Sequence, residues 1–327
     1  MKAFVLKNQG QEGWGEFCDM QLPVLDPNKI RVKVKAASIN PVDYKISKGD
    51  GKFKVSTPKI LGCDFAGDID QIGENVSMFS PGQRVAGLAS LTGHGSFAEY
   101  VDVDPHILFI IPDKVSYEEA AVVPCAGITA WQAIIEKVAT PYDSFIFITA
   151  GGGGVGGFAI QFASKILRGK PITTATQGYE RIYALGAEHI INYKTEDIPE
   201  RVNEITLGQG VKTVIDMISP ESAMENSKLL CFNGAIVTVQ GRLPEFPFPP
   251  FTKAVTIGEV ALGASLMHND IPSMKAISKA GEIILHMIKD KQIDPMITHT
   301  FKFDELPKAF DMISSGKTQG KISITIS

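Results

Sequence analysis

The spacing of apolar and polar residues divides the chain into stretches that predict different kinds of structure. Near the N-terminus, Ile30, Val32, Val34 and Ala36 alternate with charged residues, which is the period-two pattern of a half-buried β-strand. Glycine, asparagine and proline then interrupt short apolar runs over residues 67–89. These residues favour turns, so the first third of the chain is expected to be rich in β-strands.

The pattern changes near residue 117, where residues 116–137 predict a helix. Ser116 is the expected N-cap, Glu118 and Glu119 stand in the first turn, and Pro124 interrupts the segment. From residue 143 onward, continuous apolar runs alternate with helical segments; the runs lie at residues 144–150, 171–176, 189–193, 213–218 and 235–241. Strands buried on both faces and separated by helices predict a parallel, doubly wound sheet and an α/β fold class.

The pattern changes again after about residue 267. Amphipathic helices are expected at residues 273–293 and 306–316, followed by a strand at 321–327. We expect this tail to return to the first domain. The predicted domains are therefore residues 1–121 with 268–327, and an inserted nucleotide-type domain at residues 122–267.

Composition narrows the class of protein. The chain has 327 residues, of which 44% are hydrophobic and 21% charged, as in a soluble globular protein. A net charge of −4 argues against nucleic acid as the main partner. No apolar run approaches the roughly 18 residues of a membrane span, and the N-terminus lacks an apolar signal core, so a cytoplasmic protein is expected.

A glycine-rich loop at residues 151–156 predicts a dinucleotide site. Gly151, Gly153 and Gly156 fit the pattern G-x-G-x-x-G between a predicted strand and a predicted helix. In that context the glycines permit a tight turn, close approach of the backbone to a pyrophosphate, and close packing of helix on strand. The residues predicted to bind cofactor here are Gly151, Gly152, Gly153, Gly154, Val155 and Gly156.

The next predicted strand indicates which dinucleotide binds. An NAD site usually places Asp or Glu about 20 residues after the motif begins, but this strand ends in Thr174, Ala175 and Thr176. Without that carboxylate a 2′-phosphate is not repelled, so NADPH is favoured. Arg181 and Tyr193 are the candidates near that phosphate, with Lys194 beside them; the alternative is that Arg181 and Lys194 are ordinary surface charges.

Several segments, in order along nearly the whole chain, resemble the medium-chain dehydrogenase/reductase superfamily. They are residues 36–49, 58–85, 124–134, 149–163, 185–194 and 316–324. Within that superfamily the chain resembles the quinone oxidoreductase branch and the related enone reductases. The resemblance implies a β-rich GroES-like catalytic domain, a Rossmann domain that binds NADP, and a homodimer.

The same resemblance bears on zinc. The cysteine-rich lobe of the zinc alcohol dehydrogenases has no counterpart here, and Asn40, Cys63 and Cys125 stand where those enzymes have catalytic zinc ligands. Two thiols and a neutral amide are a poor zinc set, although Asp64 offers a further ligand. We therefore expect no metal. The alternatives left open are a zinc-dependent alcohol dehydrogenase with a degenerate metal site and a non-catalytic NADPH-binding sensor.

Without zinc, hydride transfer to a quinone or an α,β-unsaturated carbonyl is the favoured reaction, because the acceptor spreads its charge onto an oxygen that a hydrogen-bond donor can stabilise. By resemblance, Asn40 fixes the loop or polarises the substrate, Asp43 orients its neighbours, Lys45 donates to the substrate oxygen, and Tyr44 lines the pocket or supplies a proton. The competing interpretation is that these are turn, surface and packing residues.

The remaining cofactor residues also come from the resemblance or from strand ends. Thr129 is expected near the nicotinamide carboxamide, in a cleft between the domains. Gln240 and Gly241 follow a predicted parallel strand, where ligands collect in open α/β sheets. The aromatic and proline-rich loop at residues 243–251 either covers a substrate pocket, packs on the surface or contacts a second subunit.

Overall fold

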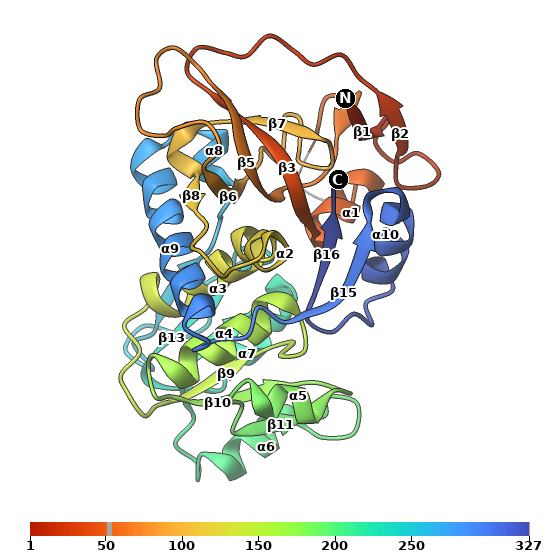
Figure 1. Cartoon of the computed structure of the whole chain (residues 1–327). Helices are drawn as coiled ribbons and strands as arrows, with labels where there is room; N and C mark the ends of the chain where they lie inside the picture. The colour runs from red at the N-terminus through yellow and green to blue at the C-terminus, as the bar shows by residue number, and fades with distance from the viewer. Residues whose placement is uncertain (51–53, 327) are drawn as a thin grey trace. The chain divides into compact units, whose positions relative to one another are not determined.

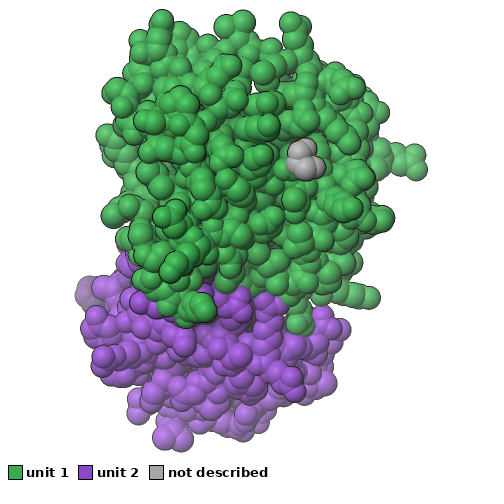
Figure 2. Space-filling view, viewed as in Figure 1, with its two compact units in different colours: residues 1–128, 262–291, 295–327 green, residues 129–261, 292–294 purple. Residues whose placement is uncertain are grey.

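A computed structural model describes residues 1–50 and 54–326, so Ser327, the last residue of the predicted final strand, lies outside the described residues. The chain forms two compact units, coloured separately in Figure 2. Unit 1 comprises residues 1–128, 262–291 and 295–327, and unit 2 comprises residues 129–261 and 292–294. These units are defined by contacts; the domain boundaries expected from the sequence stay a prediction.

Unit 1 is built on two β-sheets (Figure 1). The smaller sheet has the order β2–β1–β4, with β1 at Lys2–Leu6, β2 at Glu16–Asp19 and β4 at Lys59–Ile60. The larger, seven-stranded sheet has the order β15–β16–β3–β5–β6–β8, with β7 paired to β3. Its strands are β3 (Ile30–Ile39), β5 (Asp64–Ile72), β6 (Arg84–Leu88), β7 (Tyr100–Val103), β8 (Phe109–Ile110), β15 (Ile297–Lys302) and β16 (Lys321–Thr325).

The C-terminal tail supplies part of this larger sheet. Strand β16 runs antiparallel to β3, pairing Ile324 with Ala37, and parallel to β15. The helices of unit 1 are α1 (Pro41–Lys48), α2 (Tyr117–Ala121), α8 (Ala264–Met267), α9 (Ile271–Lys289) and α10 (Leu306–Ser314), with short 3₁₀ turns at Pro105–Ile107 and Phe303–Glu305.

The helix expected at residues 116–137 forms in pieces. Ser116 is its N-cap as predicted, since its hydroxyl accepts from the Glu119 N–H at 3.1 Å. Helix α2 then gives way to a π-helical turn at Val123–Gly127, followed by α3 (Ile128–Trp131) and a second π-helical turn at Gln132–Glu136. Pro124 has no N–H to donate to the preceding turn, which explains why the α-helix stops before it.

Unit 2 contains a six-stranded parallel sheet with the order β11–β10–β9–β12–β13–β14. Its strands are β9 (Phe145–Ile148), β10 (Lys170–Thr174), β11 (His189–Ile191), β12 (Val211–Asp216), β13 (Leu230–Thr238) and β14 (Thr256–Glu259). Helices α4 (Gly154–Lys165), α5 (Tyr179–Ala184), α6 (Ile198–Ile205) and α7 (Pro220–Ser227) connect the strands. This arrangement confirms the predicted parallel, doubly wound sheet.

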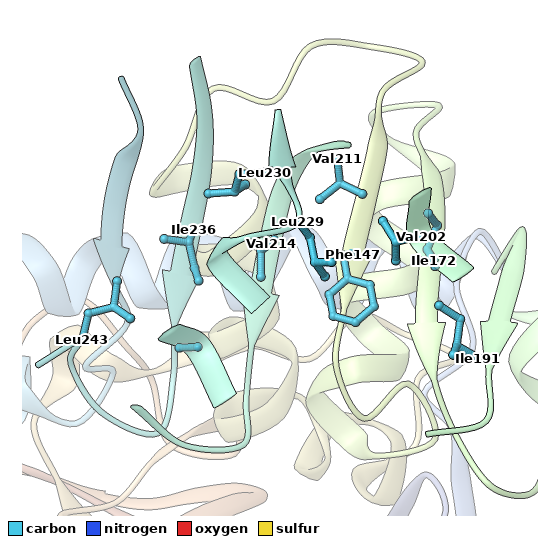
Figure 3. Packing of buried hydrophobic residues seen from close by; sticks show 11 residues of the cluster. Phe147, Ile172, Ile191, Val202, Val211, Val214, Leu229, Leu230, Ile236 and Leu243 are labelled. Carbon is cyan, nitrogen blue, oxygen red and sulfur yellow. The ribbon is translucent and has the colours of Figure 1, made fainter. Parts of the chain in front are cut away.

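The core of this sheet follows directly from the apolar runs. Phe147, Ile172, Val214 and Ile236 come from four adjacent strands, are fully buried, and belong to one hydrophobic cluster (Figure 3). Burial of a side chain of this size contributes about 1.5–3 kcal/mol to folding. This buried core holds in place the strands from which the loops of unit 2 begin.

Among the described residues, no helix combines the length and the apolar character that crossing a membrane requires.

Candidate coenzyme site and polar cluster

The order in which strands are added to the sheet of unit 2 reverses between β9 and β12, although all its strands are parallel. Strands β10 and β11 extend the sheet on one side of β9, whereas β12, β13 and β14 extend it on the other. In open α/β sheets, ligands bind at the carboxyl ends of the strands at such a switch point. The predicted glycine loop directly follows β9, so the fold brings it to this location.

The glycines of the loop differ in what surrounds them. A Cβ added to Gly156 would lie 2.3 Å from the carbonyl oxygen of Ala150, and one added to Gly151 would lie 2.3 Å from Oγ1 of Thr173. At Gly153 the nearest atom to an added Cβ would be the Ala150 carbonyl oxygen, at 3.4 Å, which is ordinary contact. Packing within unit 2 therefore requires glycine at residues 151 and 156, but leaves room for a side chain at residue 153.

Gly153 is also the N-cap of α4, which begins at Gly154 as expected, and as a glycine it has no side chain that could cap the helix. The first N–H groups of an α-helix have no carbonyl partner within the helix, and they favour an anion. A nicotinamide dinucleotide fits here: glycine is present where packing does not need it, at a helix N-terminus suited to a pyrophosphate.

Thr174 lies against the glycine loop. Its hydroxyl accepts from the Ala150 N–H at 3.0 Å, and its carbonyl accepts from the Gly151 N–H at 3.2 Å. Thr174 is buried, while Thr176 and Arg181 are half-buried and Tyr193 is exposed. The structure thus gives Thr174 a part in shaping the loop, and it leaves the Thr176, Arg181 and Tyr193 side chains accessible.

The other residues predicted to bind cofactor also lie in unit 2. Gln240 and Gly241 follow β13, next to β12 in the sheet, with Gln240 exposed and Gly241 at a φ of 142°. Thr129 is buried within α3. Their binding roles stay predictions.

In unit 1, the predicted catalytic loop is the start of α1. Strand β3 ends at Ile39, Asn40 is the N-cap, and Pro41 occupies the first turn, where its missing N–H costs nothing. The Asp43 carboxylate accepts from the Asn40 backbone N–H at 2.7 Å. Asp43 therefore fixes the entry of the helix, while its expected role in orienting catalytic neighbours stays a prediction.

The Asn40 side chain is buried, with 2% of its surface exposed, and it is fully engaged. Its Oδ1 accepts from Lys321 Nζ at 2.6 Å, and its Nδ2 donates to Asp64 Oδ2 at 2.7 Å. The same amide nitrogen lies 3.5 Å from the sulfur of Cys63. Of the two roles expected for Asn40, this geometry favours fixing the loop over polarising a substrate.

Asp64 is the centre of this polar cluster. Its Oδ1 accepts from the Cys125 backbone N–H at 2.8 Å, and its Oδ2 lies 3.8 Å from the ammonium of Lys321. Burial raises the pKa of Asp64 to about 6, with Lys321 and the hydrogen bonds acting in the opposite direction.

Burial also dominates the titration of two further groups. It raises the pKa of Asp43 to about 7, although the Asn40 backbone hydrogen bond lowers it. It lowers the pKa of Lys59 to about 8, while Asp43 acts in the opposite direction. The ammonium of Lys59 donates to the carbonyls of Ser90 and Gly93.

Tyr44 and Lys45, the other residues predicted to be catalytic, are less buried than Asn40 and Asp43. Both are half-buried on α1, and the Tyr44 ring meets Trp14 edge-on with centroids 6.4 Å apart. The loop thus divides into buried residues that hold it and accessible residues that remain candidates for contact with a substrate.

Lys321 is the residue of this cluster that the sequence analysis missed. It begins β16 and is only 4% exposed, yet it lies 281 residues from Asn40 in the chain. A lysine at the start of an apolar strand was the available signal. Its partner could not be identified without the pairing of β16 with β3.

The same geometry bears on the possible zinc site. The ligand atoms of Cys63, Asp64 and Cys125 all lie within 4.8 Å of one another. However, both carboxylate oxygens of Asp64 already accept hydrogen bonds, and the Lys321 cation lies beside them. A metal ion would have to displace these partners, so the donor set fits zinc poorly.

Two family models match separate parts of the chain. A family model described as an alcohol dehydrogenase GroES-like domain matches residues 26–113, and one described as a zinc-binding dehydrogenase matches residues 185–324. The chain is 27% identical over 304 residues to quinone oxidoreductase-like protein 2 of Bos taurus, which covers 92% of this chain and 86% of that protein.

Two further similarities extend over nearly the whole chain. The 2-methylene-furan-3-one reductase of Solanum lycopersicum is 28% identical over 323 residues, covering 94% of this chain and 74% of that protein. The solved structure of the quinone oxidoreductase from Coxiella burnetii is 28% identical, with a TM-score of 0.84, and the match covers 100% of this chain and 99% of that one.

Proposed function

Since the chain belongs to the medium-chain dehydrogenase/reductase superfamily, in its quinone oxidoreductase-like branch, we propose that it is an NADPH-dependent oxidoreductase. The proposed enzyme works without zinc and reduces a quinone or an α,β-unsaturated carbonyl. The observation that carries this proposal is the glycine loop at the switch point of the parallel sheet, where Gly153 is not required by packing. Members of the family bind nicotinamide coenzymes, and relatives named for quinone and furanone reduction support the acceptor class.

The proposed coenzyme site uses residues of unit 2. Gly152–Gly156 and the start of α4 hold the pyrophosphate. Thr129, Gln240 and Gly241 hold the nicotinamide end, while Thr176, Arg181 and Tyr193 surround the adenosine phosphate. No carboxylate occupies residues 174–176, so a 2′-phosphate meets no like charge there. When bound, the reduced nicotinamide supplies a hydride to the acceptor.

Residues of unit 1 provide the polar groups for the acceptor. The Lys45 ammonium donates a hydrogen bond to the acceptor oxygen, which gains negative charge as the conjugated system is reduced. The Tyr44 hydroxyl is placed one residue earlier on the same helix and supplies the proton that completes the reduction. Asn40 and Asp43 contribute by holding α1 in place through their buried hydrogen bonds.

Coenzyme consumption across a panel of quinones, enals and enones tests the reaction. We expect turnover of at least one class with NADPH, and a lower dissociation constant for NADPH than for NADH. NADPH binding without turnover of any acceptor would instead identify the non-catalytic sensor, and equal or tighter binding of NADH would reject the coenzyme preference.

Metal analysis of the purified protein tests the zinc-dependent alternative, for which the close approach of Cys63, Asp64 and Cys125 is the supporting observation. Stoichiometric zinc together with alcohol oxidation would replace our proposal. We further propose that the protein is a cytoplasmic homodimer; sedimentation of the purified protein and localisation of a tagged chain check these two statements.

A further inference from the structure

Two of the four cysteines lie close together in unit 1. Cys63 directly precedes β5, and Cys125 lies in the π-helical turn at Val123–Gly127. Their sulfurs lie within 4.8 Å of each other. Cys18 and Cys231 instead have oxygen atoms as their described partners, at Glu16 and Phe232 respectively. The chain thus contains one thiol pair and two cysteines with other surroundings.

The backbone holds both members of the pair. The Cys125 N–H donates to Asp64 Oδ1 at 2.8 Å, and the Cys63 carbonyl accepts from the Ala89 N–H at 2.6 Å. The 61 residues between the two cysteines are therefore folded so that the sulfurs stay near each other. A disulfide bond requires the two sulfurs to approach to about 2.0 Å, so the side chains must close the remaining gap.

The two sulfurs differ in access. Cys63 is fully buried, whereas Cys125 is half-buried. A reagent in solution therefore meets Cys125 first. Cys63, which solvent does not reach, has the Cys125 sulfur beside it instead.

We propose that Cys63 and Cys125 form an oxidation site, which a small-molecule disulfide converts into an intramolecular disulfide bond. In the first step the Cys125 sulfur attacks the reagent disulfide, forms a mixed disulfide and releases one small thiol. In the second step the Cys63 sulfur attacks the Cys125 sulfur and releases the second small thiol. The two cysteines lose two electrons and two protons, and the reagent disulfide gains them as two thiols.

Closure of this bond alters the surroundings of the catalytic loop. The Cys63 sulfur lies 3.5 Å from Asn40 Nδ2 and 3.8 Å from Asp64 Oδ1. Forming the bond removes the thiol proton that faces Asp64. A change in reductase turnover on oxidation rests on the proposed function, whereas formation of the bond does not.

The experiment uses the full-length, metal-free protein with oxidised glutathione as the probe, and it is read by intact mass, thiol titration and peptide mapping. We expect a loss of two of the four titratable thiols, a mass decrease equal to two hydrogen atoms, and a Cys63–Cys125 cross-linked peptide. The loss should reverse with dithiothreitol. These readouts do not depend on any oxidoreductase activity.

Serine variants make the order of the steps testable. Cys63→Ser should accumulate the mixed disulfide at Cys125. Cys125→Ser should form no intramolecular disulfide, so its thiol titration should show no loss of two thiols. The matched control, Cys18→Ser combined with Cys231→Ser, should still form the intramolecular bond. Circular dichroism establishes that each variant is folded.

Three results would overturn the proposal. They are an unreacted Cys63–Cys125 pair, a mixed disulfide that persists at Cys125 in the wild-type protein, and a cross-link through Cys18 or Cys231 that leaves the pair reduced.

Discussion

The polar cluster of unit 1 and the glycine loop of unit 2 are both candidate parts of one reaction, but they are built in opposite ways. In unit 1, the charged and amide groups of Asn40, Asp64 and Lys321 are buried and bind one another. In unit 2, the loop at residues 151–156 carries no charged side chain, and its Gly153 has room around it.

This difference means that the buried cluster contributes mainly to folding stability, whereas the glycine loop is suited to binding a ligand. A buried polar group that already has partners contributes mainly to holding the fold, and its removal leaves the partners unsatisfied. A position that the fold does not need, such as Gly153, is available for a ligand. Substitutions in the two regions should therefore change different measured quantities.

The largest expected effect is on stability in unit 1. Lys321→Met should lower the free energy of unfolding by about 3–5 kcal/mol, because it leaves the buried Asp64 carboxylate without its cation. Denaturant unfolding measures this change. Adding Asp64→Asn to Lys321→Met should restore part of the loss, since the unpaired charge is then removed.

The matched control for this lysine is Lys308→Met. Lys308 pairs with Glu305 at 3.0 Å on the surface of α10, with 70% of its side chain exposed, and its loss should change stability by less than about 1 kcal/mol. Equal effects of the two substitutions would mean that the buried cluster contributes nothing special to unit 1.

The next effect concerns turnover. Lys45→Ala should lower the turnover of an enone or quinone about 100-fold or more, as expected when one donor to a developing oxyanion is lost. Its NADPH dissociation constant should change by less than about tenfold. Lys48→Ala, on the exposed side of the same helix, is the control and should keep near-wild-type rates. An unchanged rate in Lys45→Ala would remove this lysine from the mechanism.

In unit 2, Gly153→Val should weaken NADPH binding about 100-fold, which corresponds to about 2.7 kcal/mol, while leaving the unfolding transition nearly unchanged. An added Cβ would make only an ordinary contact, 3.4 Å from the Ala150 carbonyl oxygen, and the valine side chain would occupy the place proposed for the pyrophosphate. Binding is measured by calorimetry. Retained affinity would show that the phosphates lie elsewhere.

Gly156→Ala sharpens this comparison, because its Cβ would lie 2.3 Å from the Ala150 carbonyl oxygen. Overpacking of this kind costs about 1–3 kcal/mol of stability. The two glycine substitutions should thus separate ligand binding from packing within a single loop.

The last expected effect, the smallest per pH unit, is on the pH dependence of stability. Asp43 has a folded pKa of about 7, above its unfolded value of about 3.9, so the folded state holds more protons between those pH values. Its contribution to stability is full below about pH 4 and is lost as the pH rises towards 7 and through it, with a slope of at most about 1.4 kcal/mol per pH unit.

Unfolding measured at several pH values in the wild type and in Asp43→Asn tests this titration. Asparagine keeps an oxygen that can accept from the Asn40 N–H, and its side chain does not titrate. The decline between pH 4 and 7 should be shallower in the variant. Identical slopes would show that Asp43 is ionised throughout that range.

The elements that depend on local pattern were predictable from the sequence. The parallel strands of unit 2, the start of α4 at Gly154, the N-cap at Ser116 and the expected GroES-like and Rossmann fold class are confirmed. The strands, the helix start and the N-cap follow from apolar spacing, capping chemistry or a motif within about 20 residues of chain, whereas the GroES-like expectation came from the family resemblance.

What could not be predicted depends on contacts between distant residues. The π-helical turns around Pro124 and the strand β15, which lacks an alternating burial pattern, have no clear local signal. The bonds of Lys321 with Asn40 and Asp64 require the register of β16 against β3. The sequence alone therefore leaves both roles of Asn40 open, while the fold gives its amide to structural partners.

The position of β16 in the larger sheet has a consequence for synthesis of the protein. Until the ribosome has made residue 321, Asn40 and Asp64 lack their cation and β3 lacks its neighbour β16. Because domains fold as their residues become available, unit 2 has all but three of its residues by residue 261, long before unit 1. A nascent chain thus acquires its coenzyme loop first, and the helix bearing Lys45 gains its buried anchor among the last steps.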